Sequence, residues 1–111
     1  MRNRLAKVRQ LLAAGWTNEF YWTDASGKPV EPEVATHFCL AGAVAFVTHD
    51  RRGGVGFSKQ SQELFRAIQP HLPPSHAKDE YALRACLRFN DSHTQQEVLD
   101  AIDKAIAHSN T

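Results

Sequence analysis

The sequence has almost no excess of charge of either sign. Its thirteen lysines and arginines against twelve aspartates and glutamates leave a formal charge of +1. Proteins that hold nucleic acid or an anionic membrane on a broad electrostatic surface carry a clear basic excess. The balance therefore argues against nucleic acid as a partner. The N-terminal segment contains four basic residues close together, Arg2, Arg4, Lys7 and Arg9. Such a local density of charge is typical of an ordinary helix surface.

The sequence also lacks a long hydrophobic run. Its longest apolar stretch, Phe38 to Val47, covers ten residues, whereas a membrane-spanning helix needs about 20. Residues 1 to 10 contain no continuous apolar stretch of the kind found in a secretory signal. We therefore expect a cytoplasmic protein with no membrane segment.

Cysteine is scarce, and no metal-binding pattern is present. The only two cysteines, Cys39 and Cys86, lie far apart in apolar segments, which is typical of reduced, packed thiols. Zinc motifs bring their ligands in close pairs two to four residues apart. The spacing of His37 and Cys39 is too short for such a pair, and the other histidines are scattered. The sequence predicts neither a metal nor a cofactor.

What the chain does contain is the composition of one globular domain. It is 42% hydrophobic and 23% charged, and a chain of this length buries about two-thirds of its unfolded surface on folding. No repeat, low-complexity tract or linker interrupts it. We therefore expect a single helical domain spanning residues 1–111.

Apolar residues at helical spacing predict about five helices. The first lies between Asn3 and Gly15, the second runs from Pro32 through Val47, the third begins after Ser58 and stops before Pro70, the fourth covers about Lys78 to Phe89, and the fifth follows Thr94. Thr94 and Glu97 form a capping-box pattern at the start of the last helix.

The second expected helix is the centre of the predicted fold. It is apolar on every face from Phe38 to Val47, so other helices must surround it. Gly42 in its interior predicts the close approach of a neighbouring helix. The aromatic residues from Trp16 to Trp22, followed by a turn containing Gly27, predict a small β-hairpin. The expected fold is mainly α, with about five helices around a central apolar helix and a small β-hairpin.

Several short segments occur in a fixed order along residues 15 to 106. They are Gly15-Trp16-Thr17; Asp24, Gly27, Pro29 and Val30; Cys39-Leu40-Ala41-Gly42-Ala43; Phe89-Asn90-Asp91; and Thr94 through Ile106. This ordered set resembles an uncharacterised family of small proteins from bacteria and their phages. Phe89 departs from the family's more frequent Trp, and residues 51 to 74 are individual to this chain. The resemblance implies a phage or prophage accessory setting and supplies no catalytic residues.

One constellation suggests enzyme chemistry. If the second helix begins near Thr36 instead of Pro32, Cys39 lies in its first turn, where the helix dipole would favour the thiolate. This alternative is a cysteine-dependent hydrolase or transferase with Cys39 as nucleophile, His93 or His37 as base, and Asn90 or Asp91 orienting the imidazole. The neighbours of Cys39 in sequence are apolar, however, and burial raises the pKa of a thiol and makes it inert. A packed core cysteine is the preferred interpretation.

The pair Asn90-Asp91 has a simpler structural interpretation. It stands a few residues before Thr94, where short amide and carboxylate side chains bond to their own backbone and shape turns. We therefore expect both residues to lie in the turn between the last two helices.

The aromatic segment has a structural interpretation, as the cover of one end of the helical core, and a functional one, as a binding surface together with one basic loop. Four aromatics fall within seven positions, Trp16, Phe20, Tyr21 and Trp22, more than one end of a small core requires. Trp, Tyr and Arg are the residue types most frequent at interface hot spots. We expect partner binding by Tyr21 and Trp22 and by the glycine-containing loop that begins with Arg51 and Arg52.

The preferred function is therefore a non-enzymatic protein-binding module, phage- or prophage-associated, that modulates a host or defence protein. The cysteine-dependent enzyme is the first alternative. A small-ligand-binding protein with a pocket beneath the aromatic segment is the second.

Overall fold

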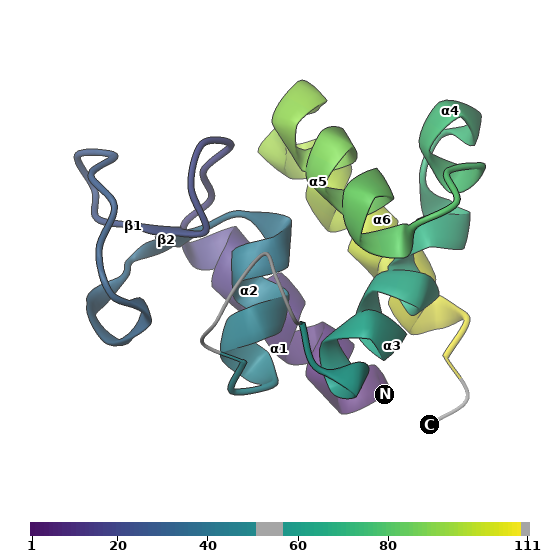
Figure 1. Ribbon diagram of the computed structural model, residues 1–111, viewed down its shortest axis with the longest axis horizontal. Helices are drawn as coiled ribbons and strands as arrows, with labels where there is room; N and C mark the ends of the chain where they lie inside the picture. Colours follow the sequence, from purple (N-terminus) through teal and green to yellow (C-terminus); the bar gives the residue numbers. More distant parts are fainter. Residues whose placement is uncertain (51–56, 110–111) are drawn as a thin grey trace.

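A computed structural model describes residues 1–50 and 57–109. Within these residues the fold comprises six α-helices, two single-turn 3-10 helices and one two-stranded antiparallel sheet (Figure 1). The α-helices are α1 (Arg2–Ala14), α2 (Leu40–Val47), α3 (Lys59–Ile68), α4 (Pro74–Ala77), α5 (Ala82–Ser92) and α6 (Gln95–Ala107). The 3-10 helices are η1 (Pro32–Val34) and η2 (Gln69–His71), and the strands are β1 (Trp22–Thr23) and β2 (His37–Phe38). The mainly helical fold with a small sheet is confirmed.

Helix α2 is the buried centre of the molecule, as its sequence predicts. Residues 40 to 45 are all buried, and the helix contacts α1, α3, α5 and β2. In Figure 1 it lies between the sheet with its loops on the left and helices α3 to α6 on the right. A helix that is apolar on all sides has to be enclosed in this way, because any exposed face would leave apolar surface in water.

Helices α1 and α6 join the two ends of the chain. The Gln95 side chain, at the start of α6, donates to the carbonyl of Leu12 near the end of α1 (2.9 Å). Arg9 pairs with Asp103 further along α6 (2.6 Å), so the two helices are antiparallel. The buried stripes that face the core are Leu5, Val8 and Leu12 on α1 and Val98, Leu99, Ala101, Ile102 and Ala105 on α6.

The second helix begins later than predicted. Pro32 starts only the single turn η1, and the chain is then extended until Cys39, the N-cap of α2. The backbone N–H groups of Thr36 and Phe38 donate to the carbonyls of Thr23 and Gly15 (each 3.0 Å). Because these groups bond to distant segments, they are not free to make helical bonds.

The predicted hairpin is present only in part. The turn forms as expected: the Asp24 carboxylate accepts from the N–H groups of Ser26 and Lys28, and Gly27 has a φ of 87°. After it, however, the chain makes only an isolated bridge from Pro29 to Thr23. The regular partner of β1 is β2, with Trp22 opposite Phe38 and Thr23 opposite His37.

Gly42 permits a close approach, but not by a helix. A Cβ at this position would collide with the backbone of Tyr21, in the segment that leads into β1. Gly15 is similar: its φ of −170° is extended rather than left-handed, and a Cβ would collide with the carbonyl of Thr36. Gly42 therefore allows the aromatic segment to pack directly on α2, and Gly15 allows the residues before β2 to pack at the end of α1.

The remaining helix boundaries differ in detail from those predicted. The cap of α1 is Met1 instead of Asn3, and the proline-rich connector contains the one-turn helix α4. Helix α5 begins at Ala82 and continues through Ser92, so Asn90 and Asp91 lie inside a helix. The prediction that this pair forms a turn is wrong. The capping box of α6 forms as predicted: Thr94 and Glu97 each accept from the other's backbone N–H.

Candidate functional site

Cys39 is held as a capping side chain rather than as an exposed thiol. It is 5% exposed, and its Sγ accepts from the backbone N–H of Gly42 (3.3 Å). Burial raises the pKa of this thiol to about 12, outweighing the backbone N–H groups of Gly42 and Ala41 that lower it. At neutral pH the group is therefore a protonated thiol, which is a poor nucleophile.

Of the described residues proposed as its catalytic partners, Asp91 lies near Cys39, but neither histidine bonds to it. Asp91 shares a hollow of about 280 Å³ with Cys39, lined also by Glu19, Phe20 and Tyr21. Its negative charge raises the pKa of the thiol further. In the described chain neither His93 nor His37 bonds to Cys39: His93 Nδ1 lies 3.0 Å from the carbonyl of Phe89, and His37 Nδ1 lies 2.8 Å from Thr36 Oγ1. The described residues that line this hollow include two carboxylates and no histidine, so the thiol–imidazole pair of the predicted enzyme is not formed there.

Asn90 connects three segments of the fold. It is 1% exposed, and its Oδ1 accepts from Trp16 Nε1 (2.8 Å) and from the backbone N–H of Leu40 (3.1 Å). Its Nδ2 donates to the carbonyl of Thr17 (3.2 Å). One amide thus ties the aromatic segment and the first residue of α2 to α5. This role is structural, and local sequence could not reveal it because the partners lie 50 to 74 positions away.

Several side chains of the aromatic segment make contacts that stabilise the fold. Trp16 donates to Asn90, and Trp22 donates from its Nε1 to the carbonyl of Gly42 (3.0 Å). Tyr21 is half-buried and packs edge-on against Trp22 and Phe57, with ring centroids 5.7 and 6.2 Å away. Phe20 is 45% exposed. Of the predicted binding residues, Trp22 and Tyr21 are therefore half-buried, and Arg51 and Arg52 lie outside the described residues.

Two adjacent hollows meet at Phe46 and His49, at the end of α2. The larger, of about 310 Å³, lies between α1 and α2 and is lined by Lys7, Gln10, Leu11, Phe46, Val47 and His49. The smaller, of about 90 Å³, is lined by Trp22, Pro32, Ala45, Phe46, His49 and Asp50. Phe46 is 37% exposed, although residues 40 to 45 of the same helix are buried. We call this region the Phe46 face.

His49 adopts a strained conformation at the centre of this face. Its backbone N–H donates to the carbonyl of Phe46, and that of Asp50 donates to the carbonyl of Ala45, the bonding pattern of a Schellman cap. This cap needs a left-handed residue, and His49 has a φ of 60°. Glycine is the usual residue there, and a side chain with a Cβ costs roughly 1 to 2 kcal/mol. Such strain is concentrated at functional sites.

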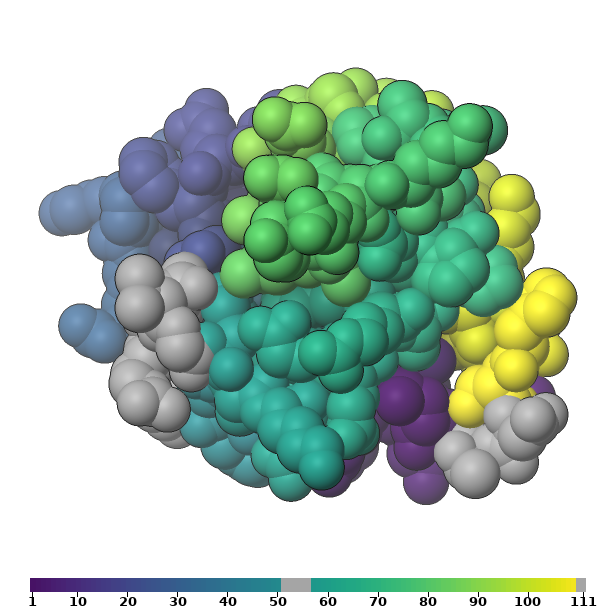
Figure 2. Space-filling model, turned by 45° about the vertical axis from the view of Figure 1, so that its right-hand side comes forward, coloured from purple at the N-terminus to yellow at the C-terminus, as the bar shows by residue number. Residues whose placement is uncertain are grey.

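A further hollow, of about 310 Å³, lies between α3 and α5. Its lining includes Gln62, Arg66, Tyr81 and Arg84, and Figure 2 shows the two helices (teal and green) side by side on this surface. Tyr81 is 57% exposed, and the Arg84 guanidinium lies 5.0 Å from its ring centroid.

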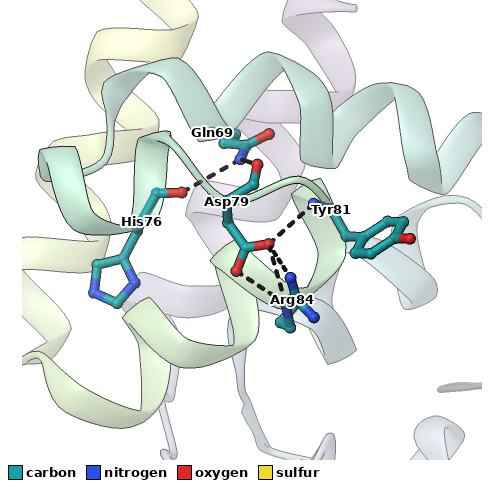
Figure 3. A network of polar contacts seen from close by, with 5 residues as sticks. All are labelled: Gln69, His76, Asp79, Tyr81 and Arg84. Atoms are coloured by element: carbon teal, nitrogen blue, oxygen red, sulfur yellow. Dashed lines mark hydrogen bonds and ion pairs between the residues drawn. The ribbon is translucent and has the colours of Figure 1, made fainter.

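Asp79 fixes this arginine and the start of α5 (Figure 3). Its carboxylate accepts from Arg84 Nη2 (2.8 Å) and from the backbone N–H of Tyr81 (3.0 Å). The hydrogen bonds from Arg84 and Tyr81 lower the pKa of Asp79 to about 2. Gln69 completes the network by donating to the backbone carbonyls of His76 and Asp79. The charge of Arg84 is therefore paired within this network.

Four of the six histidines form two ring pairs. The rings of His71 and His108 lie 4.8 Å apart, and those of His76 and His93 lie 5.5 Å apart. Burial, and then the neighbouring histidine, lower the pKa of both His71 and His76. Among the residues that the structure describes, no three His, Cys, Asp or Glu side chains are grouped so that they could hold a metal ion.

Comparison with known proteins places the chain in a family without assigning a reaction. A model of DUF6197, a family of unknown function, matches residues 1–108. The chain belongs to this family. DUF6197 confirms the expected membership in an uncharacterised family and brings no catalytic or binding residue with it. No curated protein and no solved structure matches the chain. Across residues 1–50 and 57–109, none of the helices combines the length and apolar character needed to span a membrane.

Proposed function

We propose that this chain is a non-enzymatic protein-binding module and that the Phe46 face is its binding surface. The observation that carries the proposal is the exposure of Phe46 between two adjoining hollows, on a helix whose residues 40 to 45 are all buried. An aromatic side chain in a concave, mostly apolar setting is the typical anchor position of a protein interface.

The strained backbone of His49 also supports a binding role for this face. Glycine at position 49 would relieve the strain of the left-handed conformation, whereas histidine adds a ring to the rim of both hollows. The side chain therefore contributes something that helix capping alone does not require.

The residues expected from the sequence fit into the same proposal. Trp22 lines the smaller hollow, and Arg51 and Arg52 follow Asp50, which lines it too. Tyr21 packs edge-on against the ring of Trp22. A phage or prophage setting and a host or defence protein as target complete the proposal, on the basis of the sequence resemblance. A cytoplasmic location is proposed from the short apolar runs and the two scattered cysteines.

The test is site-specific cross-linking of the intact protein. A photoreactive phenylalanine analogue replaces Phe46 in one variant and Tyr81, on the α3–α5 surface, in a control variant. We expect irradiation in lysate to give a discrete adduct from position 46 alone, and excess wild-type protein to suppress it. Equal adducts from both positions, or none from position 46, would contradict the proposal.

A further inference from the structure

The α1–α2 groove is the part of the Phe46 face that combines an apolar floor with basic side chains. The groove is the larger hollow, of about 310 Å³. Its floor is apolar and comes from two helices: Leu11 from α1, and Phe46 and Val47 from α2. Leu11 lies outside the fully buried stripe of α1, so the core does not enclose it.

The apolar floor is preorganised. The ring of Phe46 packs edge-on against that of Phe38, with centroids 5.5 Å apart, and Phe38 is itself 4% exposed. A ring held in this way has already lost most of its rotational freedom, so little further side-chain entropy is lost when a ligand covers it.

The charge beside this floor is entirely positive in the two helices that form it. Helix α1 contains four basic residues and no acidic one, and α2 contains no charged residue. Arg9 is paired with Asp103 on α6 (2.6 Å). Lys7 lines the groove itself, and Arg4 lies one helical turn before it on the same side of α1.

The acidic residue that follows α2 does not offset this charge. Asp50 is 6% exposed, and its carboxylate accepts from the backbone N–H of Ser58 and the hydroxyl of Ser61. A ligand in the groove therefore meets Lys7 and its basic neighbour without a competing carboxylate from either α1 or α2.

The backbone of the groove determines the form of its occupant. Both walls are α-helices, whose main-chain groups bond within each helix. They offer no sheet edge to which an extended peptide could add as a strand. A segment pressed onto this apolar floor must satisfy its own backbone groups, and a helix does so.

We infer that the α1–α2 groove binds a short, acidic, amphipathic helix of a partner protein. Its apolar face packs between Leu11 and Phe46, and carboxylates on its flanks pair with Lys7 and Arg4. From Arg4 to Leu11 the wall of α1 covers seven residue steps, which at about 1.5 Å per residue gives about 10 Å, so about two turns of the occupant face it. This inference rests on the proposed function, since it names the partner chemistry of the same face.

The probe is a displayed library of helical peptides of about 16 residues, selected on the wild-type protein and counter-selected on Phe46→Ala. We expect the enriched peptides to carry apolar residues at i, i+3 or i+4, and i+7, with Asp and Glu beside them. The best peptide is then synthesised, and its affinity is measured for wild type, Phe46→Ala, Lys7→Glu, Gln10→Glu and Tyr81→Ala.

We expect Phe46→Ala to weaken binding about thirtyfold, as loss of an interface hot spot does. Lys7→Glu and Gln10→Glu reverse or add charge at exposed positions of α1, and each should weaken binding about tenfold at low salt and less at high salt. Tyr81→Ala, outside the groove, should bind as wild type does. Should Phe46→Ala fail to fold, the two α1 variants still decide the question.

Each contrary outcome has a distinct meaning. The enriched peptides could depend on Phe46 but be neutral or basic, or bind Lys7→Glu as tightly as wild type. Either result contradicts an acidic helix as the occupant and leaves the proposed binding face intact. The inference is also wrong if no peptide is enriched. It is equally wrong if the protein instead binds anionic lipid vesicles in a way that depends on Lys7, or if it associates with itself and loses that association in Phe46→Ala. Failed cross-linking from position 46, combined with successful peptide selection, overturns the proposed function alone.

Discussion

At the scale of single residues, Asn90 carries the most structural consequence. Its replacement by Ala leaves the indole N–H of Trp16, the N–H of Leu40 and the carbonyl of Thr17 without their partner. Each buried polar group left unpaired costs about 1 to 3 kcal/mol. We expect Asn90→Ala to lower the free energy of unfolding by at least about 2 kcal/mol in urea titrations.

The matched control is the next residue on the same helix. Asp91 is exposed, and substitutions at such positions usually change stability by no more than about 0.5 kcal/mol. If Asp91→Ala were as damaging as Asn90→Ala, the effect would come from α5 itself and not from the amide's three bonds.

Two glycines give a second contrast between causes of destabilisation. A Cβ on Gly42 would collide with the backbone of Tyr21, whereas a Cβ on Gly27 meets nothing within 4 Å. Gly27 instead has a φ of 87°, so alanine there costs only the conformational strain, about 1 kcal/mol.

The consequence is a clear order of stability between the two variants. Backbone atoms cannot rotate away as side chains can, so Gly42→Ala forces the aromatic segment to shift and should cost about 1 to 3 kcal/mol or more. Thermal melts followed by circular dichroism measure both variants. A Gly42→Ala protein as stable as Gly27→Ala would mean that the contact between α2 and the Tyr21 segment is looser than described.

These residues also show where sequence reasoning succeeds and where it stops. The capping box of Thr94 was predictable because its two partners lie three positions apart. The interpretation of Asn90 as a turn residue was wrong because the bonds that decide its role reach Trp16 and Leu40. Gly42 was predicted as a contact point, but the identity of its neighbour, Tyr21, depends on tertiary structure.

At the scale of elements, the start of α6 depends on the side chain of Thr94. Its Oγ1 accepts from the backbone N–H of Glu97 (3.3 Å), and Glu97 Oε1 accepts from the N–H of Thr94 (3.0 Å). Thr94→Ala removes the first bond and should cost about 1 kcal/mol without changing the fold. Chemical denaturation measures the loss, and Thr94→Ser, which keeps the hydroxyl, should restore most of it.

The same contrast between local and distant causes governs whole elements. Helices α3 and α6 were predicted well because their caps and apolar stripes are local. The start of α2 was not, because the extended residues before Cys39 follow from bonds to Gly15 and Thr23, far away in the sequence. The Phe46 face was missed for a related reason: Phe46 reads as core in an apolar run, and only packing reveals that this ring is left partly exposed.

The carboxylate of Asp79, at the start of α5, should make the free energy of unfolding depend on pH in the acid range. Hydrogen bonds from Arg84 and Tyr81 lower the pKa of Asp79 to about 2 in the folded protein, compared with about 3.9 in an unfolded chain. A lowered carboxyl pKa stabilises the fold above the unfolded value, and this contribution is lost as the pH falls towards about 2.

Asp79→Asn is the variant that isolates this contribution. It should be less stable than wild type at pH 7, and the difference should shrink from about pH 4 downwards and vanish below about pH 2. Urea midpoints at several pH values measure it. Glu80→Gln, at an exposed neighbouring position, is the control and should leave the pH profile unchanged; a constant difference between Asp79→Asn and wild type would contradict the assignment to this carboxyl.

At the scale of the whole molecule, the packing of α1 against α6 links the two ends of the chain. Both helices bury their apolar stripes in the core cluster that also contains α2. Neither end can therefore unfold without exposing the centre, which predicts one cooperative transition for residues 1–111.

The variants that test this cooperativity remove core volume from opposite ends of the chain. Leu5 on α1 and Ile102 on α6 are both 0% exposed, and each truncation to Ala should cost about 2 to 5 kcal/mol. Circular dichroism reports on the helices, and tryptophan fluorescence reports on Trp16 and Trp22 beside the sheet. We expect both signals to shift together in both variants, because one core supports both regions; a fluorescence transition that stays at its wild-type midpoint while the helices melt earlier would divide the chain into two folding units.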